Sequence, residues 1–378
     1  MSRARIVSCL TLLAASTSCA SSSGSAKAPW YLHALTFNAA LAPGFEPYSA
    51  ERLPSVVAAL SLAAQQLDVM CIQEFWVESD FDLLVDAASE SLPYALHASP
   101  RPGSGVCESS ELSSLGSCAQ SHCSAAGDDS VACIQSECTT EVVSLSGGCL
   151  GCLLNHLDDF AQCARTGAPV ADDPAIFGGN SDVGLLSRYP ISRQQILPLD
   201  AYLQRGVVLY AQIEVPNLGP VHAFCTHLSS PLGVIPYVGP HGSWQGEHAR
   251  ETEQLLSFIA AEAESGPLLV MGDLNMGLAL NGKGAVLPDD FARLQASGLR
   301  DPYLDSGNPE CSECSDNSFR SPDSVDDLID HLLVKAFPIS TANVTQSSAT
   351  PVAVANNGTT RDTHLSDHFG LQLELTSR

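Results

Sequence analysis

The sequence predicts an α/β sandwich, in which two packed β-sheets are flanked by helices. Many short apolar runs of strand type are interspersed with a few stretches that have helical spacing. Apolar residues make up 45% of the 378 residues, which is ample for a large core. Clusters of acid, amide and histidine side chains sit at or just beyond several strand-like runs, and no internal repeat is visible.

The first part of the chain should form three strands and two helices. Alternating or short apolar runs predict the strands, and apolar residues at helical spacing predict the helices. In chain order these elements are the strand Tyr31–Phe37, the helix Arg52–Leu67, the strand Asp68–Ile72, the helix Phe81–Leu92 and the strand Tyr94–His97.

From Ile176 onward the strand pattern resumes, on the same two criteria. The expected strands are Val183–Ser187, Val207–Val215, Val221–Cys225, Leu268–Met271, Leu328–Val334 and Phe369–Leu375. The expected helices are Glu247–Ala263 and Asp289–Ala296.

Residues 102–170 interrupt this pattern and are expected to form an inserted, disulfide-bonded subdomain. Between residues 107 and 163 the chain holds eight acidic residues and no Lys or Arg, with too little apolar surface to fold unaided. An even number of cysteines in an exported chain favours disulfides, among 105 pairings that the sequence leaves open. These cysteines are Cys107, Cys118, Cys123, Cys133, Cys138, Cys149, Cys152 and Cys163. The insertion could select substrates, bind a partner or only stabilise the fold.

The remaining cysteines have separate interpretations. Cys311 and Cys314 are expected to form a further pair or a local loop. Cys149-x-x-Cys152 and Cys311-x-x-Cys314 could instead supply a tetrahedral zinc site, although an oxidising compartment favours disulfides. Cys71 and Cys225 lie inside apolar runs, and we expect them to be inert core residues.

Residues 1–29 are expected to be an export signal. Arg3 and Arg5 precede an apolar stretch over residues 6–15, and small residues follow around 16–20. The stretch is too short and wrongly flanked for a membrane span. Cys19 is either the lipid-bearing first residue of a lipoprotein or an unmodified residue near the cleavage site. The protein is thus expected to be secreted or lipid-anchored at the cell envelope.

The strongly acidic composition disfavours nucleic acid as a partner. The formal charge is −25, and it becomes −27 without Arg3 and Arg5. Non-specific binding to nucleic acids depends on Lys and Arg that neutralise phosphates. The acidity could also serve only to keep an exported protein soluble, but it lowers the expectation of a nuclease that acts on long DNA.

Two of the polar clusters suit the hydrolysis of a phosphate ester. Gly272-Asp273-Leu274-Asn275 directly follows an apolar run, and alternation past the strand end points Asp273 and Asn275 the same way. A carboxylate there can orient water and an amide can steady a phosphoryl oxygen, although Gly-Asp-x-Asn is also a common turn. Glu74 follows a strand and precedes Phe75-Trp76, so its carboxylate is expected to lie beside bulky apolar groups. Burial of an unpaired charge is costly, and coordination of a metal would offset that cost. An exposed, solvated Glu74 is the alternative.

Histidines mark two further strand ends. His368 follows Asp367 at the start of the last strand, and Asp330 could fix its imidazole from a neighbouring strand. His227 ends another run and could contact the phosphate or protonate the leaving group. A hydrogen-bonded structural histidine is the alternative for each. Alternation sends His331 to the face opposite Asp330. His222, His241, His248 and His364 are expected to be surface or loop residues.

The order and surroundings of these clusters resemble the endonuclease/exonuclease/phosphatase superfamily, which includes deoxyribonuclease I, neutral sphingomyelinases and inositol-phosphate phosphatases. Seven stretches in the same order carry the resemblance, and they span residues 30–378 except the insertion. They are Leu35–Asn38, Asp68–Glu74, Val183–Ile191, Cys225–His227, Val270–Asn275, Ile329–His331 and Leu365–His368.

The resemblance implies a four-layered α/β sandwich and metal-dependent cleavage of phosphate esters, with Mg²⁺ expected and Mn²⁺ or Ca²⁺ also compatible with oxygen ligands. By motif position, metal ligands would be Asn38 and Glu74, with Asp367 joining them or lying close by. Asp273 would orient the attacking water, and Asn275 and His227 would contact the phosphate. Asp330 and His368 would form an acid/base or charge-stabilising pair.

Two segments resemble the sphingomyelinase branch of this superfamily more loosely, Arg205–Ala211 and His248–Leu255. Between them, the uncharged loop Pro231–Gly239 could contact a membrane interface or could pack on the protein's own core. We therefore expect a phosphodiesterase that releases a lipid head group. An exported deoxyribonuclease is the alternative within enzymology, and a catalytically inactive binding or adhesion module is the alternative from another class. The sequence does not indicate an oligomeric state.

Overall fold

The computed structural model describes residues 28–377, except 44, 100–106, 126–129, 157–159, 165–175, 178–179, 233–234, 236, 238, 281–283, 339–340 and 357–358. Most of the expected export signal, including Cys19, therefore lies outside the described residues. Among the described residues, no helix is long and apolar enough to span a bilayer.

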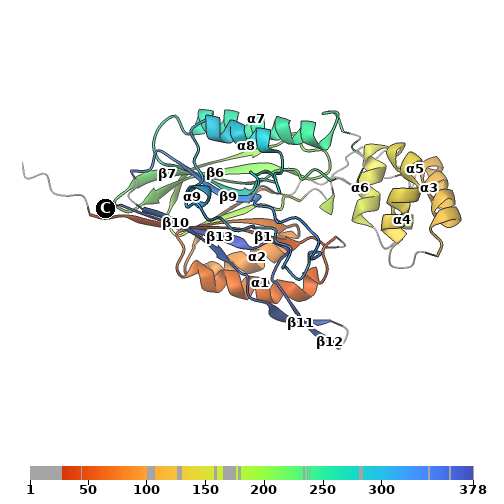
Figure 1. The fold of residues 1–378 in the computed structure, drawn as a ribbon, viewed down its shortest axis with the longest axis horizontal. Coiled ribbons are helices and arrows are strands. Elements are labelled where there is room, and N and C mark those ends of the chain that lie inside the picture. The colour runs from red at the N-terminus through yellow and green to blue at the C-terminus, as the bar shows by residue number, and fades with distance from the viewer. Residues whose placement is uncertain are drawn as a thin grey trace, which may run out of the picture.

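The chain folds into the predicted α/β sandwich of four layers, a helix layer on the outside of each of two packed sheets (Figure 1). The first sheet has the order β10-β13-β1-β2-β4-β3. Its strands are β1 (Tyr31–Leu41), β2 (Val69–Phe75), β3 (Tyr94–His97), β4 (Gly184–Ser187), β10 (Thr341–Ser347) and β13 (Gly370–Thr376). The second sheet has the order β5-β6-β7-β8-β9. Its strands are β5 (Ile191–Pro198), β6 (Val207–Val215), β7 (Gly219–His227), β8 (Leu268–Asp273) and β9 (Asp330–Lys335).

Helices α1 (Ser49–Ala64) and α2 (Glu78–Ala88) cover the first sheet, and α7 (Trp244–Glu262) and α8 (Pro288–Ala296) cover the second. The inner faces of both sheets share one apolar core, in which residues such as Val69 and Leu373 meet Leu209 and Ala223. A short helix α9 (Pro302–Asp305) precedes β9, and the hairpin β11 (Val352–Asn356) and β12 (Thr359–Thr363) projects from the body (Figure 1).

Strand direction gathers the polar clusters at one end of the sandwich. β1 and β2 are parallel, as are β7 and β8, so all four strands end there. β9 and β13 run antiparallel to these strands and begin there. In the second sheet His227 pairs in register with Asp273, which pairs with Asp330. Residues distant in sequence thus become neighbours.

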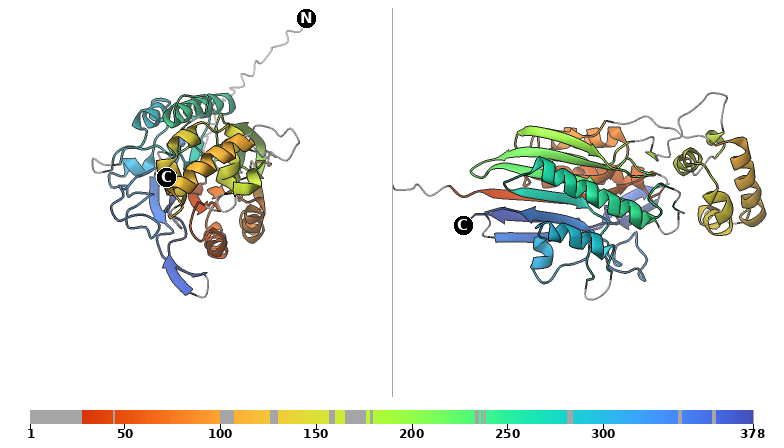
Figure 2. Two further views of the ribbon diagram at one scale, coloured as in Figure 1. Left: turned by 90° about the vertical axis from the view of Figure 1, so that its right-hand side faces the viewer. Right: turned by 90° about the horizontal axis from the view of Figure 1, so that it is seen from above.

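The segment between β3 and β4 forms a group of small helices at the end of the sandwich away from the C-terminus (Figures 1 and 2). Its elements are α3 (Ser109–His122), α4 (Ser130–Glu137), α5 (Thr139–Val143), α6 (Gly147–Asn155) and the 3₁₀ helix Phe160–Cys163. The expected disulfides are confirmed, as Cys107–Cys149, Cys118–Cys138, Cys123–Cys133 and Cys152–Cys163. This small-helix insertion stands beside the strand ends that carry the polar clusters.

Two interpretations of the other cysteines need correction. Cys71 and Cys225 are not inert thiols but form a disulfide between β2 and β7, with their Cα atoms 5.5 Å apart. Each strand faces the inner core, and only the packing of one sheet on the other brings the two side chains together. The zinc alternative is also wrong, because Cys149 and Cys152 have other disulfide partners and Cys311 pairs with Cys314.

Several elements differ from the sequence prediction. β1 and β2 continue to Leu41 and Phe75, so Asn38 and Glu74 lie within strands rather than beyond them. β5 was not predicted, because it is an edge strand whose side chains are mostly exposed and polar. The insertion helices were not predicted; their buried cluster combines a few aliphatic residues with disulfide-bonded cysteines.

Candidate active site

The eight residues predicted for the site come together at one end of the two sheets. The carboxylate of Asp273, the last residue of β8, lies at the centre of the cluster. Its Oδ2 is 3.0 Å from Asn38 Nδ2, 3.5 Å from His227 Nε2 and 3.9 Å from His368 Nε2. One carboxylate oxygen therefore lies close to groups from β1, β7 and the segment that precedes β13.

Glu74 and Asn38 form the part of the site that lies in the first sheet. Asn38 Nδ2 donates to Glu74 Oε1 at 2.9 Å, and its Oδ1 accepts the Ala40 amide at 2.9 Å. Glu74 has a left-handed backbone (φ 61°), a strained conformation for a side-chain-bearing residue. Burial, together with the charge of Asp367, raises the pKa of Glu74, and His227 and the Asn38 amide only partly oppose this.

Two buried histidine–carboxylate pairs flank Asp273. His368 Nδ1 lies 2.7 Å from Asp330 Oδ2, and His227 Nδ1 lies 2.5 Å from Asp182 Oδ2. In each pair the carboxylate fixes the orientation of the ring, so that Nε2 faces Asp273. Asp330, the predicted partner of His368, therefore does contact it.

Asp182 was missed by the sequence analysis, and it connects the two sheets at the site. Besides His227, its Oδ2 accepts the Glu74 amide at 3.2 Å, and its carbonyl accepts the Phe75 amide at 3.1 Å. Asp182 immediately precedes the strand run at 183–187, just as Asp367 precedes the last strand. The same strand-end criterion could have found it.

Neighbouring carboxylates raise the pKa of both imidazoles of the cluster. Burial alone lowers the pKa of His227, but the Asp182 carboxylate, helped by Asp273 and Glu74, raises it to about 10. The pKa of His368 is likewise raised well above its usual value, because Asp330 and Asp367 outweigh the effect of burial. Asp273 has a raised pKa, chiefly from burial and the neighbouring Asp330.

Asn275 is fixed at the turn that follows β8. Its backbone is left-handed (φ 48°), and its amide donates to Asp273 Oδ1 at 2.9 Å. Its side-chain Nδ2 lies 2.8 Å from the Leu228 carbonyl and 3.1 Å from His227 Nε2. The side chain of Asn275 thus lies beside His227, the other residue that the resemblance implies as a phosphate contact.

Two further histidines support this turn from outside the cluster. His331 lies on the face of β9 opposite to Asp330, as predicted; its Nδ1 contacts Asp301 at 2.7 Å and its Nε2 contacts the Met276 carbonyl at 2.8 Å. His248 was expected at the surface, but it is fully buried on α7. Its Nε2 contacts the Leu274 carbonyl at 2.9 Å and its Nδ1 contacts Asp290 at 2.9 Å.

The free energy of unfolding is expected to depend on pH through His331. Burial lowers the pKa of His331, but the hydrogen bond to Asp301 and the charge of that carboxylate raise it above the unfolded value of about 6.5. The resulting stabilisation is fully present below about pH 6.5 and is lost as pH rises through the folded pKa. Urea unfolding should show that the free energy of unfolding falls less between about pH 6 and about pH 9 in His331→Gln than in the unmodified protein. Equal losses in the two proteins would contradict the assignment.

Glu46 and Arg52 are two further charged residues near the cluster that the sequence did not single out. Burial and the charges of Asp367 and Glu74 raise the pKa of Glu46 to about 8. The Arg52 guanidinium is fully buried and donates to the carbonyls of Ala39, Ala40 and Leu365. It thereby ties β1 to the segment that carries Asp367, but offers no donor to solvent.

The donors of the cluster fit a hard divalent cation. Glu74 and Asp273 are carboxylates in surroundings that disfavour their charge, and Asp330 Oδ1 is buried with no hydrogen-bond partner in the described structure. Asp273, Asp330 and His368 bring ligand atoms within 4.8 Å of one another, as do Glu313, Asp367 and His368. Such oxygen-rich sets suit Mg²⁺. Asn38 presents Nδ2 to the carboxylates, so its coordination through Oδ1 requires rotation of the amide.

The described part of loop 231–239 packs against the small-helix insertion. Ile235 is buried, and its carbonyl accepts the Trp244 indole N–H at 2.7 Å. Leu232 and Tyr237 pack on the same apolar cluster, which includes Leu115 and Leu150 of the insertion. Residues 233, 234, 236 and 238 lie outside the described residues. These contacts support the alternative in which the loop packs on the protein itself.

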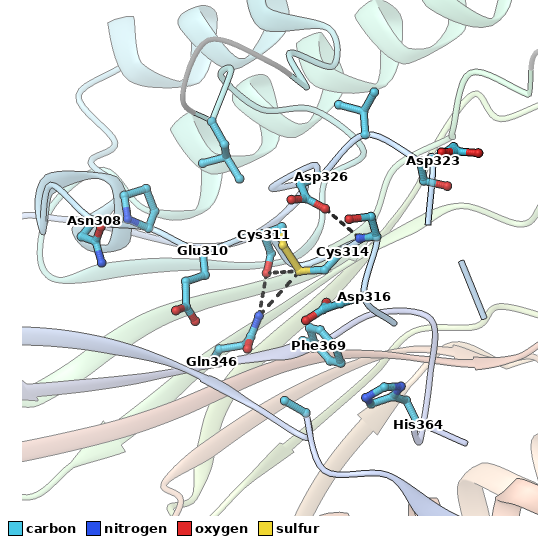
Figure 3. Close-up of a pocket in the computed structure, with 16 residues that line it drawn as sticks. Asn308, Glu310, Cys311, Cys314, Asp316, Asp323, Asp326, Gln346, His364 and Phe369 are labelled. Atoms are coloured by element: carbon cyan, nitrogen blue, oxygen red, sulfur yellow. Dashed lines mark hydrogen bonds between the residues drawn. A yellow bond between two sulfur atoms is a disulfide. The ribbon is translucent and has the colours of Figure 1, made fainter. Parts of the chain in front are cut away.

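A hollow of about 1050 Å³ is lined by residues between 308 and 326 together with Gln346, His364 and Phe369 (Figure 3). Phe369, which directly follows His368, lines it together with the disulfide Cys311–Cys314. The carboxylates that line it are Glu310, Asp316, Asp323 and Asp326, and no Lys or Arg is among its lining residues. The surface next to the cluster is therefore strongly acidic.

The chain belongs to the Endonuclease/Exonuclease/phosphatase family, whose model matches residues 35–368. No curated protein matches the chain in sequence. Among solved structures, the chain is similar to sphingomyelinase C from Streptomyces griseocarneus, with a TM-score of 0.55 and 16% identity over 91% of this chain and 99% of that one. It is also similar to a beta toxin mutant from Staphylococcus aureus with bound magnesium ions (TM-score 0.54, 14% identity, 90% and 98% covered). A third is truncated TDP2 from Caenorhabditis elegans (TM-score 0.51, 12% identity, 92% and 98% covered).

Proposed function

We propose that this protein is an exported, metal-dependent phosphodiesterase that releases a phosphorylated head group from a lipid. The observation that best supports hydrolysis is that Asn38, His227 and His368 all lie close to one oxygen of Asp273. Family membership and the fold shared with sphingomyelinases support it. Six disulfides among the described residues support export, because such bonds persist in oxidising compartments.

In this proposal the side chains of the cluster divide the work of the reaction. Asp273 orients a water molecule for attack on phosphorus and accepts a hydrogen bond from it. Asn275 and the imidazolium of His227 hold the phosphoryl oxygens, where negative charge builds up in the transition state. His368, held by Asp330, adds a second positive charge beside the reacting group. The water oxygen bonds to phosphorus as the bond from phosphorus to the leaving oxygen breaks. Asp273 takes the proton that the water loses, and the leaving oxygen gains one from solvent, so that one water molecule is consumed.

A divalent cation would be held by Glu74 and Asp367, with Asn38 as a further ligand after rotation of its amide. When bound, Mg²⁺ would polarise a phosphoryl oxygen as a Lewis acid. Mn²⁺ and Ca²⁺ accept the same oxygen ligands.

Charge distribution favours a lipid over a nucleic acid as the substrate. The small-helix insertion beside the site carries no Lys or Arg between residues 107 and 163, and the neighbouring hollow is lined by carboxylates. Arg52 is buried, and Arg320 is paired with Glu313. A polyanion would therefore meet repulsion at this end of the molecule.

A deoxyribonuclease-like activity is the second candidate, and its support is the fold shared with TDP2, one of whose structures holds a single-strand DNA product. An inactive binding module is the candidate of another class. The complete set of polar groups around Asp273 argues against it.

A panel of phosphoesters should separate these candidates. We expect release of phosphocholine from sphingomyelin vesicles, loss of that activity with a chelator, and its recovery with Mg²⁺. Plasmid DNA and inositol phosphates, tested under the same magnesium concentration, should be cleaved at least about tenfold more slowly, since the acidic surface repels polyanions. Cleavage of plasmid with untouched vesicles would overturn the lipid assignment, and no cleavage of any ester would overturn the hydrolytic one.

A further inference from the structure

Two glutamates of α7 face the same serine directly behind the candidate active site. Glu247 and Glu251 are fully buried and one helical turn apart. Ser229 Oγ lies 3.2 Å from Glu247 Oε1 and 2.9 Å from Glu251 Oε1. Ser229 follows His227 by two residues, so this carboxyl pair lies close behind a residue of the proposed machinery.

The hydrogen-bond donors around the pair favour a state with a single negative charge. A serine hydroxyl carries one proton and can donate it to only one of the two carboxylates. The outer oxygens already accept other donors, since Glu251 Oε2 takes the Ser229 amide at 2.7 Å and Glu247 Oε2 takes the Tyr237 hydroxyl at 2.9 Å. The second short contact to Ser229 Oγ is a hydrogen bond only if that carboxyl group is protonated and donates to the serine oxygen.

The surroundings of the pair favour retention of this proton. Burial raises the pKa of Glu251 to about 7, and it raises the pKa of Glu247 as well. The titratable groups that face the pair are Tyr237 and His241 from the loop before α7 and His248 of α7, and the backbone N–H of Tyr202 also donates to Glu247.

The serine in turn connects the pair to the cluster. The carbonyl of Leu228, next to Ser229, accepts the side-chain amide of Asn275 at 2.8 Å. The amide of Leu228 donates to the Asp273 carbonyl at 3.1 Å. The turn at residues 228–229 is therefore held on one side by α7 and holds Asn275 on the other.

We propose that Glu247 and Glu251 share one proton and act as positioning residues, which hold the turn at 228–229 and thereby place Asn275 and His227 for phosphodiester hydrolysis. This inference rests on the proposed function. The two glutamates touch no reacting atom and act only through Ser229 and Leu228.

Variants of Glu251 test the positioning role, with the phosphodiester that the unmodified protein cleaves fastest as substrate. Glu251→Gln should keep kcat within about threefold, because the amide can accept the Ser229 N–H and donate to its Oγ. Glu251→Leu should lower kcat by about 10- to 100-fold with little change in KM, because the turn loses its acceptor and shifts. Glu253→Gln, an exposed glutamate on the same helix, is the matched control and should behave like the unmodified protein. Unchanged kcat in Glu251→Leu, or equal losses in both Glu251 variants, would overturn the proposal.

Infrared spectroscopy tests the shared proton without any need for activity. At pH 7 the unmodified protein should show a protonated-carboxyl C=O band, and Glu247→Gln and Glu251→Gln should each lose the intensity of one group, because the remaining glutamate then ionises. Unchanged bands in both variants would overturn the shared proton. If the protein shows the expected band change but cleaves no phosphoester, the proposed function is overturned and the shared proton is not. Because both glutamine variants keep their hydrogen bonds, this test stands even if Glu251→Leu fails to fold.

Discussion

Replacement of His368 by alanine is expected to lower kcat by about 10³-fold, within the range of general acid–base and charge-stabilising contributions. His368 is buried, is held by Asp330 at 2.7 Å and faces Asp273 at 3.9 Å, so that its removal takes a positive charge away from the reacting group. Steady-state kinetics on the best phosphodiester of the panel would measure the effect.

Two further variants make this result specific. Asp330→Asn keeps the size of the side chain but removes the negative charge that orients His368 and raises its pKa. It should also lower kcat by at least about 10²-fold. His122→Ala changes an exposed histidine of the insertion and serves as the control. A His368→Ala enzyme that retains a tenth of the normal kcat would exclude His368 from the reaction.

The double variant Cys71→Ala/Cys225→Ala is expected to lose about 2 to 5 kcal/mol of unfolding free energy. The disulfide links the two sheets inside the shared core and closes a loop with a sequence separation of 154 residues. Its removal frees the unfolded chain over this long loop and leaves a small cavity in the folded core. Urea unfolding followed by tryptophan fluorescence would measure the change.

Cys123→Ala/Cys133→Ala is the matched control, because that disulfide lies within the insertion and spans only 10 residues. It should alter the global transition much less than the core variant. Equal changes in the free energy of unfolding for the two double variants would show that the bond between the sheets contributes no more to stability than the bond within the insertion.

The fold and the eight candidate residues could be read from the sequence because each lies at or near the end of an apolar run. A strand such as β8 is buried along its whole length, and its first polar residues, Asp273 and Asn275, mark the place where it reaches the site. The contact of Asp330 with His368 was also predicted, but the two residues lie at strands of different sheets, β9 and β13, rather than on neighbouring strands of one sheet.

The features that were missed depend on packing between elements. The Cys71–Cys225 bond requires knowledge of which strands of the two sheets face each other. His248 and Glu251 read as ordinary polar residues of a surface helix, and only the seating of α7 on β7 and β8 buries them. Glu46 lies in a loop with no strand-end signal, so its closeness to Glu74 and Asp367 could not be anticipated.

The bond between Cys71 and Cys225 also encloses the whole small-helix insertion, from Cys107 to Cys163, within one covalent ring. A protease that severs the backbone once anywhere inside that ring produces two fragments that stay attached. On a denaturing gel the nicked protein would run as one species until a reductant releases the halves. Damage to the most protruding part of the molecule thus need not separate the strands that carry Glu74 and His227.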